Sequence, residues 1–461
     1  MNRGMNLDRL NPIVVKELRQ GLKSRSFLIA YLGLQALMVF SMIVYFMELS
    51  NQHSRDLSGP NGFFWTMLGL IVLGFMPVRS FFAIQNEVRG QTLEMLFLTH
   101  MNSRRIANGK WMAQAIQLLM LVSAVLPYVV LRYFLGSIDL IRDLQTMGYF
   151  LGASLLLMAL GTGLSSWRSK VMRTLLTGGG IFLLFTVPRV LIIWMDSSGV
   201  LLRFTPLQVS LMLMLWGLVI AYFLEHGAAM IAPEAENHAR PRRILQLLIL
   251  GCLLGVAFLS RQVEWVWAAY VIGGGLLLVN LSQPVSGNLS VYRGKPGLRG
   301  LRLFFLPGWV SALPYSLGVL AVLWGALRHF FPGEIPAAHV VPLLFTFLYF
   351  PVLLLVLFRV RSKQWLPAYI GLHTLGMLLT LGLFIVAEVQ GVLHNPLESI
   401  LWLQSVAPAA LILILTETRI NELAAWVTWG PAAVILLLLV LLGLRPFREM
   451  LARCRQADAQ G

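Results

Sequence analysis

Charged residues are scarce in this chain. Only 12% of its 461 residues are Asp, Glu, Lys or Arg, and 57% are hydrophobic. A soluble protein carries about 25% charged residues. The mean hydropathy is +0.75. This composition excludes a soluble enzyme and predicts an all-α polytopic membrane protein, in which helices of about 20 apolar residues cross the bilayer.

Motifs that carry chemistry are also missing. The two cysteines, Cys252 in an apolar run and Cys454 near the C-terminus, form neither a disulfide pattern nor a metal pattern. No His, Asp and Glu cluster has metal-ligand spacing, so we predict no catalytic residue, no metal site and no enzymatic activity. The glycines at 178–180 lack the lysine of a phosphate-binding P-loop. No cofactor is therefore expected on this chain.

Apolar runs separated by charged breaks predict twelve membrane-spanning helices. They lie near residues 27–48, 62–85, 110–135, 147–165, 174–195, 206–226, 244–260, 265–281, 304–328, 339–358, 366–388 and 427–444. Placing both termini in the cytoplasm puts most of the 36 Lys and Arg residues on that side, as the positive-inside rule requires. The net charge of +16 then follows from topology, without a nucleic-acid partner. The predicted location is the plasma (cell inner) membrane.

One apolar run, 397–415, is ambiguous. It contains Pro408 and follows Asn395 and Pro396, so we interpret it as a re-entrant helix on the outer side. The alternative is a thirteenth span with an exported tail. The chain is thus divided into a membrane domain, 1–243, and a second six-helix membrane region, 244–461, which ends in a basic cytoplasmic tail.

The segment 11–24 precedes the first span. Its apolar and polar residues fall on opposite sides of a helix: Val14, Val15, Leu18 and Leu22 against Lys16, Arg19, Gln20 and Lys23. Asn11 suits the N-cap and Pro12 the first turn. The pattern predicts an interfacial helix on the inner leaflet, with its basic residues toward anionic headgroups. A simple membrane anchor is the alternative.

The loop 86–110 follows the second span. Leu93, Leu96 and Phe97 are spaced i, i+3, i+4, which predicts a short helix that begins near Thr92. This helix would present an apolar patch on the cytoplasmic side, either to a partner or to its own helical bundle.

Together the two segments resemble the permease subunits of type-2 ABC transporters, the class best known for export. The first motif is Asn11-Pro-x-x-x-Lys-Glu-Leu-Arg19, and the second is Glu87…Gly90-x-Thr92-Leu-Glu94-x-Leu96-x-x-Thr99…Arg105-Ile106…Gly109-Lys110. The match covers mainly residues 11–135. Two features differ from that family: twelve spans are predicted where six are common, and no second elbow or Thr-Leu-Glu loop follows Ile244.

The resemblance implies a role for each segment. The loop would carry the coupling helix that docks on a separate ATP-binding cassette ATPase subunit, and 11–24 would be the elbow helix. The implied coupling residues are Glu87, Thr92, Leu93, Glu94, Leu96 and Phe97, and the implied elbow residues are Lys16, Glu17 and Arg19. ATP would act through the partner, and alternating access would move substrate out of the cytoplasm. In the bilayer, the twelve spans would act either as a homo- or hetero-dimer of two chains or as a pseudo-dimer within one chain.

Arg189, beside Pro188 in the predicted span 174–195, is the remaining candidate site residue. It lies inside that span, at membrane depth, and so needs a carboxylate, a carbonyl group or a water-lined cavity. It either lines a translocation route or holds a Pro-kinked helix. A non-transporting membrane scaffold derived from such a permease is the alternative function. An ion-coupled transporter would need acidic residues at mid-membrane, whereas Glu225, Glu264 and Glu388 lie at span ends.

Overall fold

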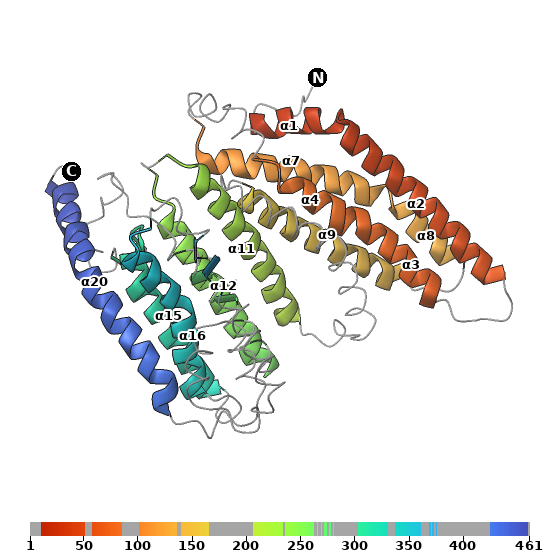
Figure 1. Cartoon of the computed structure of the whole chain (residues 1–461). Helices are drawn as coiled ribbons and strands as arrows, with labels where there is room; N and C mark the ends of the chain where they lie inside the picture. Colours follow the sequence, from red (N-terminus) through yellow and green to blue (C-terminus); the bar gives the residue numbers. More distant parts are fainter. Residues whose placement is uncertain are drawn as a thin grey trace. The chain divides into compact units, whose positions relative to one another are not determined.

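The structure, a computed structural model, is helical throughout the part of the chain that it describes, and no strand occurs there (Figure 1). The described residues are 11–50, 58–84, 101–135, 140–165, 206–233, 236–261, 303–330, 337–360 and 425–459, with a few single positions within 265–280 and 368–375. Eight of the described helices are long and apolar enough to cross a membrane. The fold is therefore consistent with a multi-pass α-helical membrane protein.

The chain forms two compact units, which divide between Ala232 and Pro233. The first unit contains α1 (Pro12–Leu22), α2 (Arg25–Ser50), α3 (Ser58–Gly69), the π-helix η2 (Leu70–Phe75), α4 (Met76–Ser80), α7 (Ser103–Ser123), α8 (Leu126–Phe134), α9 (Leu140–Leu164) and α11 (Pro206–Ile231). The second contains α12 (Ala239–Ser260), the 3-10 helix η6 (Leu303–Phe305), α15 (Trp309–Phe330), α16 (Ala337–Leu357) and α20 (Ala425–Ala459). The predicted division at 243 falls inside α12.

The eight membrane-length helices coincide with eight predicted spans. These are the spans near 27–48, 62–85, 110–135, 147–165, 206–226, 244–260, 304–328 and 427–444. A ninth predicted span, 339–358, is covered by α16. The predicted span 174–195 and the re-entrant segment 397–415 lie outside the described residues, and most of 265–281 and 366–388 does too.

The core of the first unit lies between α2, the α3–η2–α4 helix, α7 and α9. Leu34, Met38, Leu68, Leu118 and Phe150 are fully buried there. The other side of α2 is apolar but exposed, with Ile29, Leu32, Val39 and Phe46 at 48–68% exposure. Such an outward apolar face is what a lipid-facing helix requires.

A π-helical turn interrupts the α3–α4 helix. In the turn Met76 N bonds to Ile71 O, five residues back, so the next bond would join residue 77 to Val72 O. Because Pro77 has no N–H, that carbonyl lacks an intrahelical donor. Ser154 Oγ on α9 donates to Val72 O instead, at 2.6 Å in a buried position. The π turn is thereby tied to α9.

Candidate functional site

The amphipathic segment before α2 folds as a helix with the predicted cap. Asn11 Oδ1 accepts a hydrogen bond from Ile13 N at 3.2 Å, and Pro12 stands in the first turn of α1. Ile13 is buried, whereas Lys16 and Arg19 are exposed. One face of α1 therefore packs on the protein and the basic face is left free.

The packed face of α1 lies against the start of α7 (Figure 1). Asn11 Nδ2 donates to Arg105 O at 2.8 Å. Lys110 Nζ lies 2.9 Å from Glu17 Oε1, and the Lys110 side chain is only 4% exposed. A buried ammonium needs an anionic partner. Residues of both sequence motifs, which lie more than 80 positions apart, therefore meet in space.

The contact between α1 and α7 depends on a glycine. A Cβ at Gly109 would lie 2.9 Å from Asn11 Nδ2 and 3.0 Å from Ile13 Cβ. These distances are shorter than van der Waals contact, so any larger residue would push α1 away from α7. Gly109 thus lets α1 approach α7 closely, and the adjacent Lys110 forms the ion pair with Glu17.

A second polar layer joins the α1–α2 corner to the ends of α4 and α7. Arg79 Nη1 donates to Gln117 Oε1 at 2.9 Å, and Arg79 Nη2 lies 3.5 Å from Ser24 Oγ. Ser24 Oγ donates to Gly21 O at 2.6 Å. Arg79 is therefore held by side chains of this unit.

The two residues that flank the segment 85–100 pack together with α1. Ile84 precedes this segment and Met101 follows it, and both join an apolar cluster with Ile13, Ile106, Ala107, Ala228 and Ile231. Ile84 N also donates to Ser165 Oγ, just after α9, at 3.3 Å. The segment that carries the predicted coupling residues thus begins and ends in a cluster that includes α1, α7 and α11.

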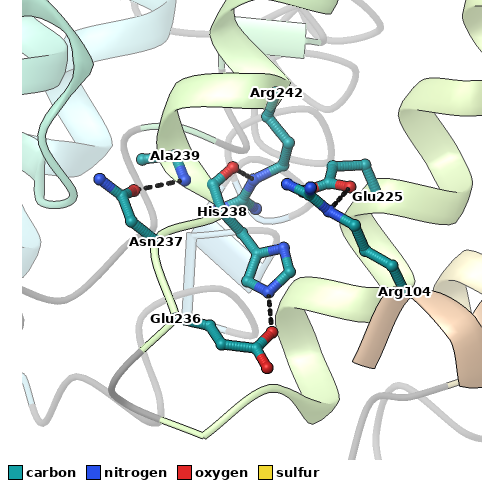
Figure 2. A network of polar contacts seen from close by, with 7 residues as sticks. All are labelled: Arg104, Glu225, Glu236, Asn237, His238, Ala239 and Arg242. Carbon is teal, nitrogen blue, oxygen red and sulfur yellow. Dashed lines mark hydrogen bonds and ion pairs between the residues drawn. The ribbon is translucent and has the colours of Figure 1, made fainter. Parts of the chain in front are cut away.

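An ion pair closes this end of the first unit. Arg104 Nε lies 2.8 Å from Glu225 Oε2, and Arg104 Nη2 donates to Glu225 Oε1 at 2.9 Å (Figure 2). This two-pronged contact joins the first turn of α7 to α11. We call the set Asn11, Glu17, Arg79, Arg104, Gly109, Lys110, Gln117 and Glu225 the elbow frame.

The predicted site residues divide into two groups. Lys16, Glu17 and Arg19 lie on α1. Glu87, Thr92, Leu93, Glu94, Leu96, Phe97 and Arg189 lie outside the described residues. The loop predicted at 86–110 is shorter than expected, because Ser103–Lys110 forms the first two turns of α7.

The ion pair of the elbow frame gives a direct prediction. Glu17→Ala is expected to destabilise the protein by about 1–3 kcal/mol, because it leaves the buried Lys110 ammonium without this carboxylate. Lys16→Ala and Arg19→Ala on the exposed face should stay within about 0.5 kcal/mol. Thermal unfolding in detergent micelles measures all three variants. Equal effects of Glu17→Ala and Lys16→Ala would contradict the assignment.

A polar cluster that the sequence pattern did not predict surrounds Arg132, near the end of α8. The Arg132 side chain is fully buried. Its Nη1 lies 3.2 Å from Asp143 Oδ2 on α9, and its Nη2 donates to Asn61 Oδ1 on α3. Three rings have their centres within 5.6 Å of the guanidinium carbon: Tyr45, Phe64 and Trp65. The buried ion pair and the ring contacts of Arg132 thus join α2, α3, α8 and α9.

The second unit contains another fully buried arginine, Arg243 on α12. It donates to the carbonyl oxygen of Phe304 and to Ser311 Oγ, the latter at 3.1 Å. Its guanidinium carbon lies 5.2 Å from the ring centre of Tyr315, whose hydroxyl donates to Arg243 O at 2.9 Å. The hydrogen-bond acceptors of this guanidinium among the described residues are carbonyl and hydroxyl oxygens. Arg243 thus joins η6 and the start of α15 to α12.

The turn before α12 is also ordered by polar contacts (Figure 2). Asn237 Oδ1 accepts from Ala239 N at 3.0 Å, and Arg242 Nε donates to His238 O at 3.1 Å. His238 Nε2 lies 2.8 Å from Glu236 Oε2. These contacts define where α12 begins.

Comparison with known proteins adds no relative: no family model, curated protein or solved structure matches the chain. Among the described residues, no group of three or more His, Cys, Asp or Glu side chains is placed to hold a metal ion. The two sequence motifs and the contacts between them are therefore the features of the chain that bear on its function.

Proposed function

We propose that this chain is the membrane-spanning permease subunit of a type-2 ABC transporter of the export class. The observation that carries the proposal is the contact between the two motifs. Glu17 of the elbow motif pairs with Lys110 of the loop motif, and Asn11 binds the Arg105 carbonyl. The resemblance implies an elbow helix that packs beside the coupling loop, and the contacts of α1 with the start of α7 support that arrangement.

The proposed mechanism is alternating access. A separate ATP-binding cassette ATPase would close on ATP and push the coupling helix formed by 92–98. Glu87 and Glu94 would make polar contacts with that subunit, and Leu93, Leu96 and Phe97 would fill an apolar hollow on it. Because Ile84 and Met101, which flank the segment 85–100, pack with residues of α1, α7 and α11, the displacement would pass into the bundle. ATP-bound partner and substrate must each favour a different state of the bundle for transport to result.

The remaining features follow from the same proposal. The chain would have twelve spans, a re-entrant segment at 397–415 and both termini in the cytoplasm, and it would lie in the plasma (cell inner) membrane. Arg189 would line the translocation route, and the export route would form in a homo- or hetero-dimer. ATP would be bound by the partner alone.

The experiment is affinity purification of the tagged full chain in mild detergent from the cells that produce it, with mass spectrometry and an ATPase assay of the eluate. The native chain is expected to recover a P-loop ATPase. The double variant Glu94→Lys, Leu96→Asp should recover at least ten-fold less of it. The conservative pair Glu94→Gln, Leu96→Met is the matched control and should retain it. All three proteins should elute alike in size-exclusion chromatography.

Two results would overturn the proposal. The first is a native chain that recovers membrane proteins without any P-loop ATPase, which would favour the non-transporting scaffold. The second is an ATPase that stays bound to the double variant as firmly as to the control, since the coupling helix would then lie elsewhere.

A further inference from the structure

Helix α20 is longer than a membrane crossing needs. It has 35 residues, or about 52 Å at 1.5 Å per residue, whereas the hydrocarbon core is about 30 Å thick. The apolar stretch of α20 ends at Leu444, and Arg445 is the first charged residue of the helix. The last four turns, 445–459, therefore extend beyond the hydrocarbon.

One side of α20 is outward-facing from Leu437 to Arg455. Leu437, Leu441 and Leu444 are 46–60% exposed, and Arg448 and Arg455 are exposed further along. Successive residues in this series are three, four or seven positions apart, so they share one helix face. The lipid-facing side of α20 thus continues without a break into an arginine-bearing side.

The opposite side of the extension is packed within the second unit. Met450, Cys454 and Ala457 are buried together with Leu306, which follows η6, and Phe447 packs against them. This packing fixes the rotation of the extension about its axis. The arginine side is therefore presented outward by the fold itself.

The outward arginines have little internal compensation. Arg445 Nε lies 3.3 Å from Glu449 Oε1, but the two side chains are 92% and 58% exposed, so the pair contributes little. Neither Arg448 nor Arg455 forms an ion pair with another described residue. The face therefore carries net positive charge that an anionic partner can neutralise.

We propose that this face binds anionic phospholipid headgroups. Its continuity with the lipid-facing leucines favours lipid over a soluble protein, because Arg445 and Arg448 lie one and four residues beyond Leu444. At 1.5 Å per residue these positions are within about 6 Å of the hydrocarbon edge, which is the depth of the headgroup layer. A guanidinium binds a phosphate group through two parallel hydrogen bonds. Arg455 lies about 16 Å beyond Leu444, too far to contact a headgroup, and attracts anionic lipid only by long-range electrostatics.

The test is native mass spectrometry of the full-length chain in detergent, titrated with phosphatidylglycerol or phosphatidylcholine. Each arginine near a charged membrane surface contributes roughly a five-fold gain in affinity. The double variant Arg445→Gln, Arg448→Gln is therefore expected to bind phosphatidylglycerol roughly ten- to thirty-fold more weakly, with phosphatidylcholine binding unchanged. Arg455→Gln should have a smaller effect. Glu449→Gln, on the same exposed part of the helix, is the matched control and should not weaken binding.

The proposal does not rest on the ATPase partner, so its outcome is independent of the transporter assignment. A native chain with equal affinity for the two lipids would overturn it. It would also fail if the double variant kept the preference for phosphatidylglycerol. An acidic soluble protein that binds the native chain and not the double variant, with unchanged lipid binding, would assign the face to a protein partner instead.

Discussion

Arg132→Met is expected to destabilise the protein by about 3–5 kcal/mol, the cost of breaking a buried ion pair by removing one of its members. The substitution keeps the apolar length of the side chain but removes the charge that faces Asp143 at 3.2 Å. Asp143 is only 4% exposed, so its carboxylate has little access to water. The contact of the guanidinium with the Phe64 ring, 4.2 Å from its centre, is lost as well. Thermal unfolding in detergent micelles measures the effect.

A double-mutant cycle separates the charge from the packing. Arg132→Met combined with Asp143→Leu removes both charges. The stability lost by this double variant should therefore be smaller than the summed losses of the two single variants, by at least about 1 kcal/mol. Arg142→Met is the matched control, because Arg142 is the exposed neighbour of Asp143 and should change stability by less than about 0.5 kcal/mol. An Arg132→Met variant as stable as Arg142→Met would show that the cluster contributes nothing.

The cluster around Arg132 explains what a sequence pattern leaves out. Arg132 stands at the end of the predicted span 110–135, where a lone arginine is usually interpreted as reaching for the headgroups. Its partners come from α2, α3 and α9, and no local spacing connects them. The hydrogen bond from Ser154 to Val72 is a similar case. The sequence shows that Pro77 has no N–H to donate to Val72 O, but it does not show that α9 supplies the donor.

Local patterns predicted the helices well. The eight membrane-length helices coincide with predicted apolar runs because hydropathy and length suffice to define a span. The helix α1 and its Asn11 cap follow from amphipathicity and capping chemistry, which involve neighbouring residues only. The predicted apolar face is right only in part: Val14 is buried, but Leu22 is exposed, and Ile13 is buried although the predicted face does not include it. The contact of Glu17 with Lys110 depends on tertiary packing, and the spacing of residues along the chain does not encode it.

Helix ends were predicted less well, for one physical reason. Hydropathy marks where a helix enters the hydrocarbon, and it does not mark where hydrogen bonding along the backbone begins. α7 therefore begins at Ser103 although its apolar run begins near 110, and α20 continues to Ala459 although its apolar run ends at Leu444. Both polar extensions carry proposed sites: Arg104 and Lys110 in the elbow frame, and the arginine face of α20.

A methyl group at Gly163 is expected to separate α9 from α11, which pack closely against each other in the first unit. The Cβ of Gly163→Ala would lie 2.4 Å from the backbone oxygen of Phe223 on α11. On the other side of the contact, a Cβ at Gly227 would lie 3.0 Å from Gly163 Cα. Because the obstacle is backbone, no rotamer change relieves it and α9 has to move away from α11. Small residues allow such close helix packing in membranes.

The expected cost of Gly163→Ala is about 1–3 kcal/mol or more, as for other overpacked sites. The control variants lie on the same two helices: a Cβ at Gly148 on α9 or at Gly217 on α11 meets nothing within 4 Å. Ala is the better helix former by up to about 1 kcal/mol, so Gly148→Ala and Gly217→Ala should be neutral or stabilising. On α9, the Gly→Ala change should therefore lower stability at 163 and leave it equal or raise it at 148. Thermal unfolding of the three variants measures this reversal.

Gly163→Ala as stable as Gly148→Ala would mean that α9 and α11 are not in backbone contact. The ion pair of Arg104 with Glu225, which approaches α11 from α7, would then be a more important tie for that end of the unit than the glycine contact.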